Sequence, residues 1–438
     1  MLPSEGLYPA VLSFVSALEA IPHLGARQAL AHLLTSLLVA QSLHPADLMR
    51  ATLSPLTVPA RQRYRRLARA WTRPWLSPSV LTPVLVRAVL RLLSVLPPAP
   101  APDGGWVVVL DSVRCGAWEI FTVGVAWHGR AVPVGWAVLP YPWPKGRFTP
   151  TVCSLVRQVA AAWPADQPVH LLADRGFPSQ ELFATLRRLG WGWTVRVRAM
   201  SYLRVAGRDC WAKDLLVAAA KPTWRSWPAT YGTGATAASG TLIIGQGLPV
   251  LPWHQRTGGS LRHRAAQQAA RRRHLRSKHP GRPPDASEET DAWVILFSSC
   301  AQTQAVAQGY RRRWTTEGTY RDGQGAWDGR HGWDLEAVVA HQRAAGPVER
   351  LVGLWALGTL LQCWLGAQTL RPQAGAVLTA HLRQWATTPR LSLWARGQFA
   401  LTDPRGHLPT WLVQAIGAAT VQLRLVAPPP DPAQPEAA

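Results

Sequence analysis

Two short apolar runs in the middle of the chain each end at an aspartate. Trp106–Leu110 reads WVVVL before Asp111, and Val169–Ala173 reads VHLLA before Asp174. Uninterrupted apolar runs of this length are typical of strands buried on both faces of a sheet. If the two strands are parallel and adjacent, both carboxylates leave the sheet at one edge, where sites are expected in such sheets. Each aspartate taken alone is better explained as a turn or helix N-cap residue, but two of them, each closing an apolar run, are a stronger signal than either.

The pattern around these runs predicts an α/β domain over residues 106–199. Strand-like and helical periodicities alternate in the order three strands, helix, strand, helix, strand, which fits a mixed sheet flanked by helices. A short turn, His128–Arg130, joins the second and third strands. The additional predicted strands are Glu119–Trp127, Ala131–Leu139 and Gly192–Val197, and the predicted helices are Thr151–Trp163 and Gln180–Leu189.

The N-terminal region, residues 1–98, is helical in pattern. His23–Ala40 is apolar at helical spacing, and Pro45, Pro59 and Pro78 stand where new helices could start. Six arginines fall between residues 59 and 73. This cluster fits a small helical DNA-binding domain, and it equally fits a solvated basic helix packed on the core. Residues 97–105 read as a linker.

Residues 200–292 interrupt the α/β pattern with short strand candidates such as Gly240–Ile244, so we expect a mostly β insertion there. Gln255–Pro284 carries many cations and no acid. Such a run is usually solvated, but in this basic chain nucleic-acid contact is the favoured interpretation. Its cations are Arg256, Arg262, Arg264, Arg271, Arg272, Arg273, Arg276, Lys278 and Arg282.

The rest of the chain returns to the first pattern. Trp293–Ser298 predicts a strand, and Gln302–Ala326 predicts one helix, within a last core segment at 293–335. A helical region follows at 336–426. Its apolar stretch Leu351–Gly366 is interrupted by polar residues, which favours a buried helix over a membrane span. Residues 427–438 are expected to be a disordered tail.

Charge and cysteine content point to a partner and a compartment. The 438-residue chain has a net charge of +23, and only four of its 47 Lys+Arg are lysine. This balance predicts a polyanionic partner such as nucleic acid, although a GC-rich genome also favours arginine codons. Five scattered cysteines without a CxxC pair argue against a zinc site or disulfides and fit a reducing cytoplasm. No secretion signal is recognisable at the start.

The stretch Tyr310–Gln324, YRRRWTTEGTYRDGQ, predicts a helix with chemistry on one face. On a helical wheel Tyr310, Arg313, Glu317 and Arg321 share that face, so a carboxylate lies between cations beside a tyrosine hydroxyl. A core helix would show an apolar stripe there instead. A solvated helix with an Arg–Glu pair is the alternative for this stretch taken alone.

Three carboxylates in the order Asp111, Asp174, Glu317 can hold two divalent ions. Mg²⁺ prefers a few carboxylates together with water and phosphate oxygens. Two such ions about 4 Å apart can activate an attacking hydroxyl and stabilise the leaving oxygen of a phosphodiester. We therefore expect these residues to be both catalytic and metal-binding, with two Mg²⁺ ions for which Mn²⁺ can substitute.

The sequence resembles the DDE transposases of bacterial insertion sequences, in the group with the signature Tyr-x2-Arg-x3-Glu-x6-Lys. Tyr310, Arg313 and Glu317 match that spacing, and Tyr320–Asp322 is also similar to the family. Further similar segments are Leu110–Ser112 and Leu172–Phe177. The resemblance covers roughly residues 106–330. It implies a ribonuclease-H-like core with a mostly β insertion between the second aspartate and the glutamate.

One position departs from this signature, because its lysine falls on Gln324, between two glycines. The helix could fray there and lose a phosphate contact that Arg321 or Arg330 would have to supply.

The resemblance implies a DNA transposase that cleaves at the inverted repeats of its element and transfers the exposed 3′-hydroxyls to target DNA. It further implies a cut-and-paste route with a hairpin intermediate and a homodimer in the synaptic complex. We expect a cytoplasmic, nucleoid-associated protein without a membrane role. A structure-selective nuclease on the same core and a noncatalytic DNA-binding protein derived from a transposase are the alternatives.

Further DNA contacts are expected around the catalytic residues. In the family, a tryptophan on the strand before the glutamate helix stacks on a base flipped out of the duplex, and Trp293 matches that position. An additional core tryptophan is the alternative among the 23 in the chain. The complete set of predicted DNA-binding residues is Trp293, Tyr310, Arg313, Arg321, Arg271, Arg272, Arg273 and Arg276.

Overall fold

A computed structural model describes most of the chain and divides it into two compact units. Unit 1 comprises residues 1–99, 108–167 and 314–438, and unit 2 comprises residues 100–107 and 168–313. Each unit is described by itself below. The described residues are 3–19, 21, 23–51, 59–71, 73–216, 224–246, 293–324, 333–368 and 410–425.

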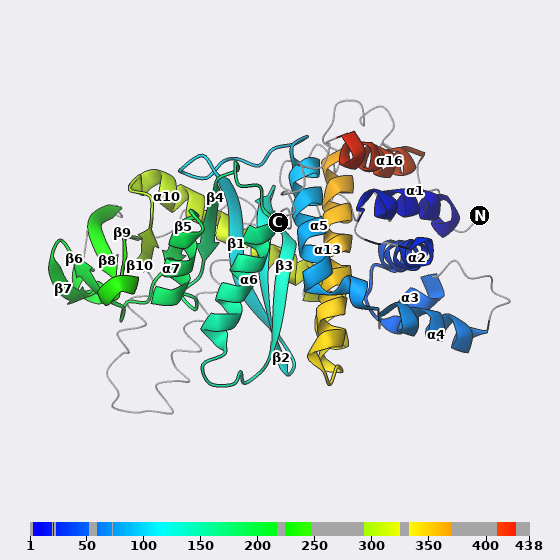
Figure 1. The fold of residues 1–438 in the computed structure, drawn as a ribbon, viewed down its shortest axis with the longest axis horizontal. Helices are drawn as coiled ribbons and strands as arrows, with labels where there is room; N and C mark the ends of the chain where they lie inside the picture. The colour runs from blue at the N-terminus through cyan, green and yellow to red at the C-terminus, as the bar shows by residue number, and fades with distance from the viewer. Residues whose placement is uncertain are drawn as a thin grey trace, which may run out of the picture. The chain divides into compact units, whose positions relative to one another are not determined.

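Unit 1 contains an antiparallel meander of three strands (Figure 1). These are β1 (Trp106–Cys115), β2 (Trp118–Trp127) and β3 (Arg130–Pro140). His128 and Gly129 both have positive φ, 39° and 86°. Two left-handed residues are what a tight two-residue hairpin requires, because their twist matches that of the flanking strands. The predicted meander and its turn are confirmed.

The predicted end of the first strand at Asp111 is wrong, because β1 continues to Cys115. Residues 108–115 pair in register with β2, and Asp111 lies opposite Thr122 in the middle of the ladder. The polar residues Asp111 and Ser112 ended the apolar run, but strand length is decided by the pairing partner, which extends to Trp118.

Helices surround this meander in unit 1. The described N-terminal region is helical, and α3 and α5 start at Pro45 and Pro78 while α4 starts directly after Pro59, as predicted. The helices of unit 1 are α1 (Pro3–Ala17), α2 (Leu24–Ala40), α3 (Pro45–Ala51), α4 (Ala60–Trp71), α5 (Pro78–Leu93), α6 (Phe148–Ala162), α11 (Trp314–Gln324), α12 (Leu335–Ala340), α13 (Ala345–Gln368) and α16 (Thr410–Leu425), with a 3₁₀ turn η1 (Pro74–Leu76).

The central helix of unit 1 is α13, which packs against β3, α2, α5 and α16. From Leu351 to Gln368 every side chain is buried, including Thr359 and Gln362. Among the described helices, α13 is the one with the length and hydropathy to cross a bilayer, and it is wholly buried in this fold. The buried helix predicted at Leu351–Gly366 is therefore confirmed.

Unit 2 is built on a mixed sheet. Its strand order is β4-β5-β10-β9-β8-β6-β7, in which β4 and β5 are parallel and the other pairs are antiparallel. The strands are β4 (Val169–Ala173), β5 (Gly192–Arg196), β6 (Tyr202–Val205), β7 (Arg208–Trp211), β8 (Arg225–Tyr231), β9 (Ala238–Gln246) and β10 (Trp293–Ser298). The helices are α7 (Gln180–Arg188) and α10 (Thr303–Tyr310), with 3₁₀ turns η2 (Ala212–Leu215), η3 (Gly234–Thr236) and η5 (Arg311–Arg313).

This arrangement agrees with the expected fold class in its coarse features. The chain is a mixed α/β protein with a large mixed sheet and flanking helices, compatible with a ribonuclease-H-like core. The described strands of the predicted insertion continue the sheet, because β9 pairs directly with β10. The predicted basic loop at Gln255–Pro284 and the tail at 427–438 lie outside the described residues.

The single helix predicted over Gln302–Ala326 is wrong. The structure divides this stretch into α10, the 3₁₀ turn η5 and α11, and the boundary between the units falls directly after Arg313. Helical spacing continues across the whole stretch, but α10 ends in unit 2 while α11 packs on β2 and β3 of unit 1. Tertiary packing has therefore overridden a continuous local pattern.

Candidate active site

Asp111 lies on the face of the unit 1 meander that receives α11. Its Oδ1 accepts a hydrogen bond from the Ser112 backbone N–H at 2.9 Å, and its side chain is half-buried. Directly opposite residues of antiparallel strands carry their side chains on the same face, so Asp111 and Thr122 point the same way. Thr122 is the point at which α11 is attached.

A buried hydrogen bond joins α11 to this face. Tyr320 Oη and Thr122 Oγ1 are 2.6 Å apart, and both side chains are almost fully buried. Burial raises the pKa of Tyr320 well above its ordinary value, and the negative charge of Asp111 raises it further. The phenol therefore stays protonated, and its partner Thr122 lies opposite Asp111 in the ladder, so α11 packs on the face that carries Asp111. Glu317 lies one helical turn before Tyr320 and is exposed.

Two further anchors fix the orientation of α11. The Thr319 hydroxyl accepts from the Ala131 N–H at 2.9 Å and donates to an adjacent carbonyl, while Asp322 forms a part-buried ion pair with Arg130. Gly318 leaves room for this arginine, since a Cβ there would lie 2.8 Å from Arg130 Nη1. With these residues turned toward β2 and β3, Glu317 and Arg321 remain exposed.

Asp174 belongs to unit 2, where it directly follows β4 as predicted. Its carbonyl accepts from the Phe177 N–H at 3.1 Å, which forms a tight turn after the strand. Its Oδ1 is buried and has no hydrogen-bond partner among the described residues. A buried carboxylate oxygen without a donor is unfavourable unless a cation satisfies it, so this atom is suited to a metal ion.

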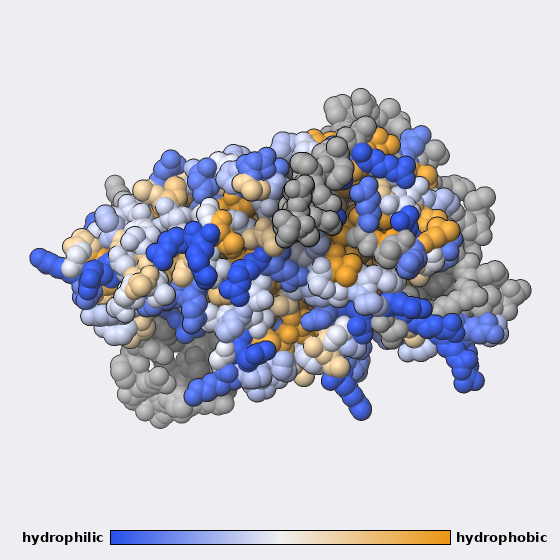
Figure 2. All heavy atoms as spheres, in the orientation of Figure 1, coloured by the Kyte–Doolittle hydropathy of each residue, from blue (hydrophilic) through white to orange (hydrophobic). Residues whose placement is uncertain are grey.

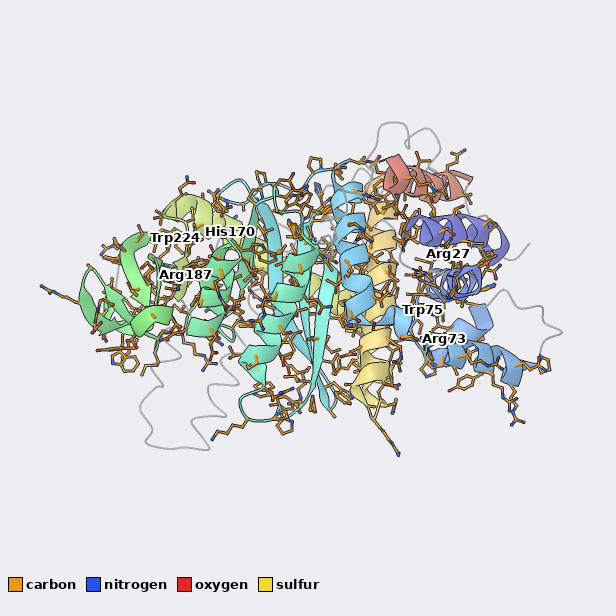
Figure 3. All side chains as sticks on the ribbon, in the orientation of Figure 1. Arg27, Arg73, Trp75, His170, Arg187 and Trp224 are labelled. Carbon is orange, nitrogen blue, oxygen red and sulfur yellow. The ribbon has the colours of Figure 1, made fainter. Side chains whose placement is uncertain are left out.

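The start of β1 is tied to the start of β4 within unit 2. Trp106 N–H donates to Pro168 O at 2.8 Å, and Asp103 lies 2.6 Å from the fully buried His170 of β4. Figure 3 labels His170. The other imidazole nitrogen lies 2.8 Å from Thr194 Oγ1. Burial alone would raise the pKa of Asp103, but the hydrogen bond and charge of His170 outweigh it and lower that pKa. Segment 100–107 is thereby fixed to the sheet of unit 2.

The predicted chemical face of Tyr310, Arg313, Glu317 and Arg321 is wrong as a single helix face. Tyr310 is 2% exposed and donates its hydroxyl to Ala173 O at 3.2 Å, next to Asp174. Arg313 is 6% exposed. Both lie in unit 2, whereas Glu317 and Arg321 are exposed on α11 of unit 1.

The other residues predicted to contact DNA lie in different parts of the chain. Trp293 is the first residue of β10, half-buried, opposite Gln246 of β9. Arg271, Arg272, Arg273 and Arg276 lie outside the described residues. On the N-terminal helices, Arg61, Arg65 and Arg69 of α4 are exposed, and Figure 2 shows strongly hydrophilic side chains projecting from the region of α3 and α4.

The metal-binding set is not assembled within one described cluster. Among the described residues, no group of three or more His, Cys, Asp and Glu side chains is positioned to hold a metal ion. Asp111 and Glu317 lie in unit 1 and Asp174 in unit 2. The donors nevertheless fit a hard divalent cation, since all three are carboxylates and Asp174 Oδ1 is buried without a donor.

Comparison with known proteins identifies one family. Residues 149–332 match the transposase DDE domain. This match spans less than half of the chain. The matched segment contains Asp174, Trp293 and Glu317 and begins after Asp111. The resemblance to DDE transposases is thus confirmed, and the domain supports a transposase function. A search of curated proteins found no match to the chain.

Several residues that position α11 were not singled out from the sequence. Thr122, Thr319 and the Arg130–Asp322 pair attach α11 to the meander. Tyr320–Asp322 was recognised as similar to the family, and that similarity was the available signal for two of these contacts. Thr122 and Arg130 carry no local signal, since polar residues of a strand gain meaning only from the helix that reaches them.

Proposed function

We propose that this protein is a DNA transposase that cuts phosphodiester bonds at the ends of its own insertion sequence and joins the ends to target DNA. The observation that carries the proposal is the match to the transposase DDE domain, which contains two of the three expected carboxylates. It is supported by the Thr122–Tyr320 bond, which attaches the Glu317-bearing helix to the face that carries Asp111.

The first reaction step would be hydrolysis. A water oxygen bonds to phosphorus, the bond from phosphorus to the 3′ oxygen breaks, and that oxygen takes up a proton to leave a free 3′-hydroxyl. In the second step this hydroxyl attacks a phosphodiester of the target, and the displaced 3′ oxygen leaves in its turn. Both steps need a negatively charged pocket for cations, surrounded by positive charge for the DNA.

Asp111, Asp174 and Glu317 are the residues that would hold divalent ions, for which Mg²⁺ is the best fit. Two such ions, when bound, supply activation of the attacking oxygen and neutralise charge on the leaving oxygen. The half-buried Asp111 already accepts one backbone N–H, which fixes its rotamer. Asp174 keeps one buried oxygen free of protein donors among the described residues. The protein thus contributes oriented carboxylates rather than a proton-transfer group.

The remaining features of the proposal concern the path of the reaction. We propose a cut-and-paste route through a hairpin on the flanking strand, in a homodimer that holds both ends. The partners are duplex DNA of the terminal inverted repeats and target DNA, within the nucleoid. The net charge of +23 supports a DNA partner, because every phosphate contact releases counterions.

The test is cleavage of a duplex that carries the inverted repeats flanking the gene, with Mg²⁺ or Mn²⁺. Asp111→Asn and Asp174→Asn should each reduce cleavage about a thousandfold or more while DNA binding stays near normal, since they would hold metal rather than DNA. Asp166→Asn, an exposed acid in the same domain match, is the matched control and should cleave normally.

The same assay separates the alternatives. A variant such as Asp174→Asn that cuts at a near-normal rate would refute the catalytic assignment. Metal-dependent cutting without strand transfer would favour a structure-selective nuclease. Binding without any cutting by the unmodified protein would favour a noncatalytic DNA-binding protein.

A further inference from the structure

The segment that joins β3 to α6 carries an exposed aromatic surface in unit 1. Residues 140–147 read PYPWPKGR, and Trp143 is 39% exposed although it is flanked by two prolines. Prolines restrict the backbone on both sides, so the indole is presented with little conformational freedom to lose. The segment can be followed below α6 in Figure 1.

A ladder of aromatic rings fixes this indole to the core. Phe121 of β2 is fully buried and packs edge-on against Phe148, with the ring centroids 5.2 Å apart. The ring centroids of Phe148 and Trp143 are also 5.2 Å apart. Trp143 also contacts Tyr141 at 5.3 Å, and the guanidinium of Arg114 lies 3.6 Å from the centre of the Tyr141 ring. The rings thus connect a buried strand position to an exposed surface, which holds Trp143 in place without covering it.

The surroundings of Trp143 are cationic. Lys145 and Arg147 are both exposed and lie just before α6, whose N-terminal end adds partial positive charge. Arg114 is exposed at the Tyr141 ring. The nearest acid in the β1–β2 ladder is Glu119, which lies opposite Arg114 but is buried and accepts a hydrogen bond from the Ser112 hydroxyl. No further aspartate or glutamate occurs in the chain before Asp166, so Lys145 and Arg147 have no acid near them in sequence. Cations beside an exposed indole form a surface suited to a nucleic-acid strand.

We propose that residues 141–147 bind a DNA strand by stacking Trp143 on an unpaired base while Lys145 and Arg147 contact its phosphates. The inference rests on the proposed function, which supplies DNA as the partner, and adds a contact outside the DDE residues. An indole face stacks on any base, so the contact would tolerate different sequences. It would favour distorted or opened DNA over a regular duplex, in which the bases already stack on one another.

The position of this segment indicates which part of the DNA it contacts. Tyr141 N–H donates to Ala117 O at 2.7 Å, so the segment begins beside the β1–β2 turn. Asp111 lies four residues before Cys115, the end of β1, or roughly 13 Å along the strand. Asp111 and Arg114 also face opposite sides of the strand. The segment therefore contacts DNA about four or more nucleotides from the reacting phosphate rather than the phosphate itself.

The experiment compares matched tryptophans on a defined probe. The probe is a DNA duplex of mixed sequence with one unpaired 2-aminopurine, whose fluorescence falls when this base stacks. The affinity of the full-length protein for this probe is measured. Trp143→Phe keeps an aromatic face, whereas Trp143→Leu keeps apolar packing without one. Trp211→Ala is the control, since Trp211 is 40% exposed and packs edge-on against Tyr202 but lies beside Asp209 and Asp214.

We expect Trp143→Leu to weaken binding about tenfold and to abolish the quenching of 2-aminopurine, while Trp143→Phe stays within about threefold of the unmodified protein. The same probe with an abasic site should bind the unmodified protein and Trp143→Leu alike. Equal affinities for Trp143→Leu and Trp211→Ala, or a loss with Trp143→Phe as large as with Trp143→Leu, would overturn the stacking role. Normal end cleavage with unaltered binding in Trp143→Leu would leave the transposase proposal intact and remove only this contact.

Discussion

Tyr310 and Arg313 in α10 and η5 are buried, whereas Glu317 and Arg321 in α11 are exposed, although all four occupy one face of a continuous helical pattern. Tyr310 gives its hydroxyl to the carbonyl of Ala173, and α11 is instead attached through Tyr320, Thr319 and Asp322. The first half of the signature therefore supports the fold beside Asp174, and the second half presents a carboxylate to solvent. Residues that share one helical spacing in the sequence therefore have different physical roles in the fold.

The largest effect is expected at Glu317, because an exposed carboxylate on a fixed helix contributes little to folding. Glu317→Gln should lower metal-dependent cleavage about a thousandfold or more and leave the thermal midpoint almost unchanged. Cleavage of end DNA and a thermal melt measure the two quantities. Glu336→Gln, an exposed glutamate on α12, serves as the control and should alter neither. A large drop in melting temperature for Glu317→Gln would contradict the difference between the buried first half of the signature and its exposed second half.

The next effect is expected at Arg313 and concerns stability. Replacing a guanidinium that is 6% exposed leaves the groups around it without their partner, so Arg313→Ala should destabilise the fold by about 3 kcal/mol. Chemical denaturation measures the loss. Arg321→Ala, which removes the same side chain from an exposed position, should change stability by less than about 0.5 kcal/mol. Similar losses in the two variants would contradict the division into buried and exposed cations.

The smallest effect is expected at Tyr320, which attaches α11. Tyr320→Phe leaves the Thr122 hydroxyl unpaired and should cost about 1–2 kcal/mol, and the double variant with Thr122→Val should recover part of that loss. Denaturation of the four proteins of this cycle measures the coupling. Additive losses would show that the hydrogen bond does not hold the helix in place.

The same residue predicts a pH dependence with a definite sign. The folded-state pKa of Tyr320 is raised by burial, and the negative charge of Asp111 raises it further, so its contribution is fully present below the ordinary value of 10.0. As the pH rises above that value the unfolded chain ionises first, and the folded state loses relative stability. Tyr320→Phe should therefore lose less stability between neutral and strongly alkaline pH than the unmodified protein. An identical alkaline decline in both would place the titration elsewhere.

Much of the α/β order could be predicted from sequence. The alternating and apolar runs of β2, β3 and β4 carry their own signal, because burial on one or both faces imposes a period on the chain. The helices of the N-terminal region and α13 follow from prolines and from continuous apolar spacing. By contrast, the end of β1, the break between α10 and α11 and the burial of Tyr310 depend on which neighbour each segment meets.

The sequence alone supplied the order Asp111, Asp174, Glu317. It also supplied the resemblance of the chain to DDE transposases and the excess of basic residues that points to DNA. A residue's identity sets which ionisable group and which metal-donor atoms it brings to the fold. The fold decided that Asp111 lies inside a strand, that one Asp174 oxygen is buried without a donor among the described residues, and that Glu317 is turned outward. Burial and orientation are set by contacts between segments far apart in the chain, such as Thr122 with Tyr320, and no local pattern encodes those contacts.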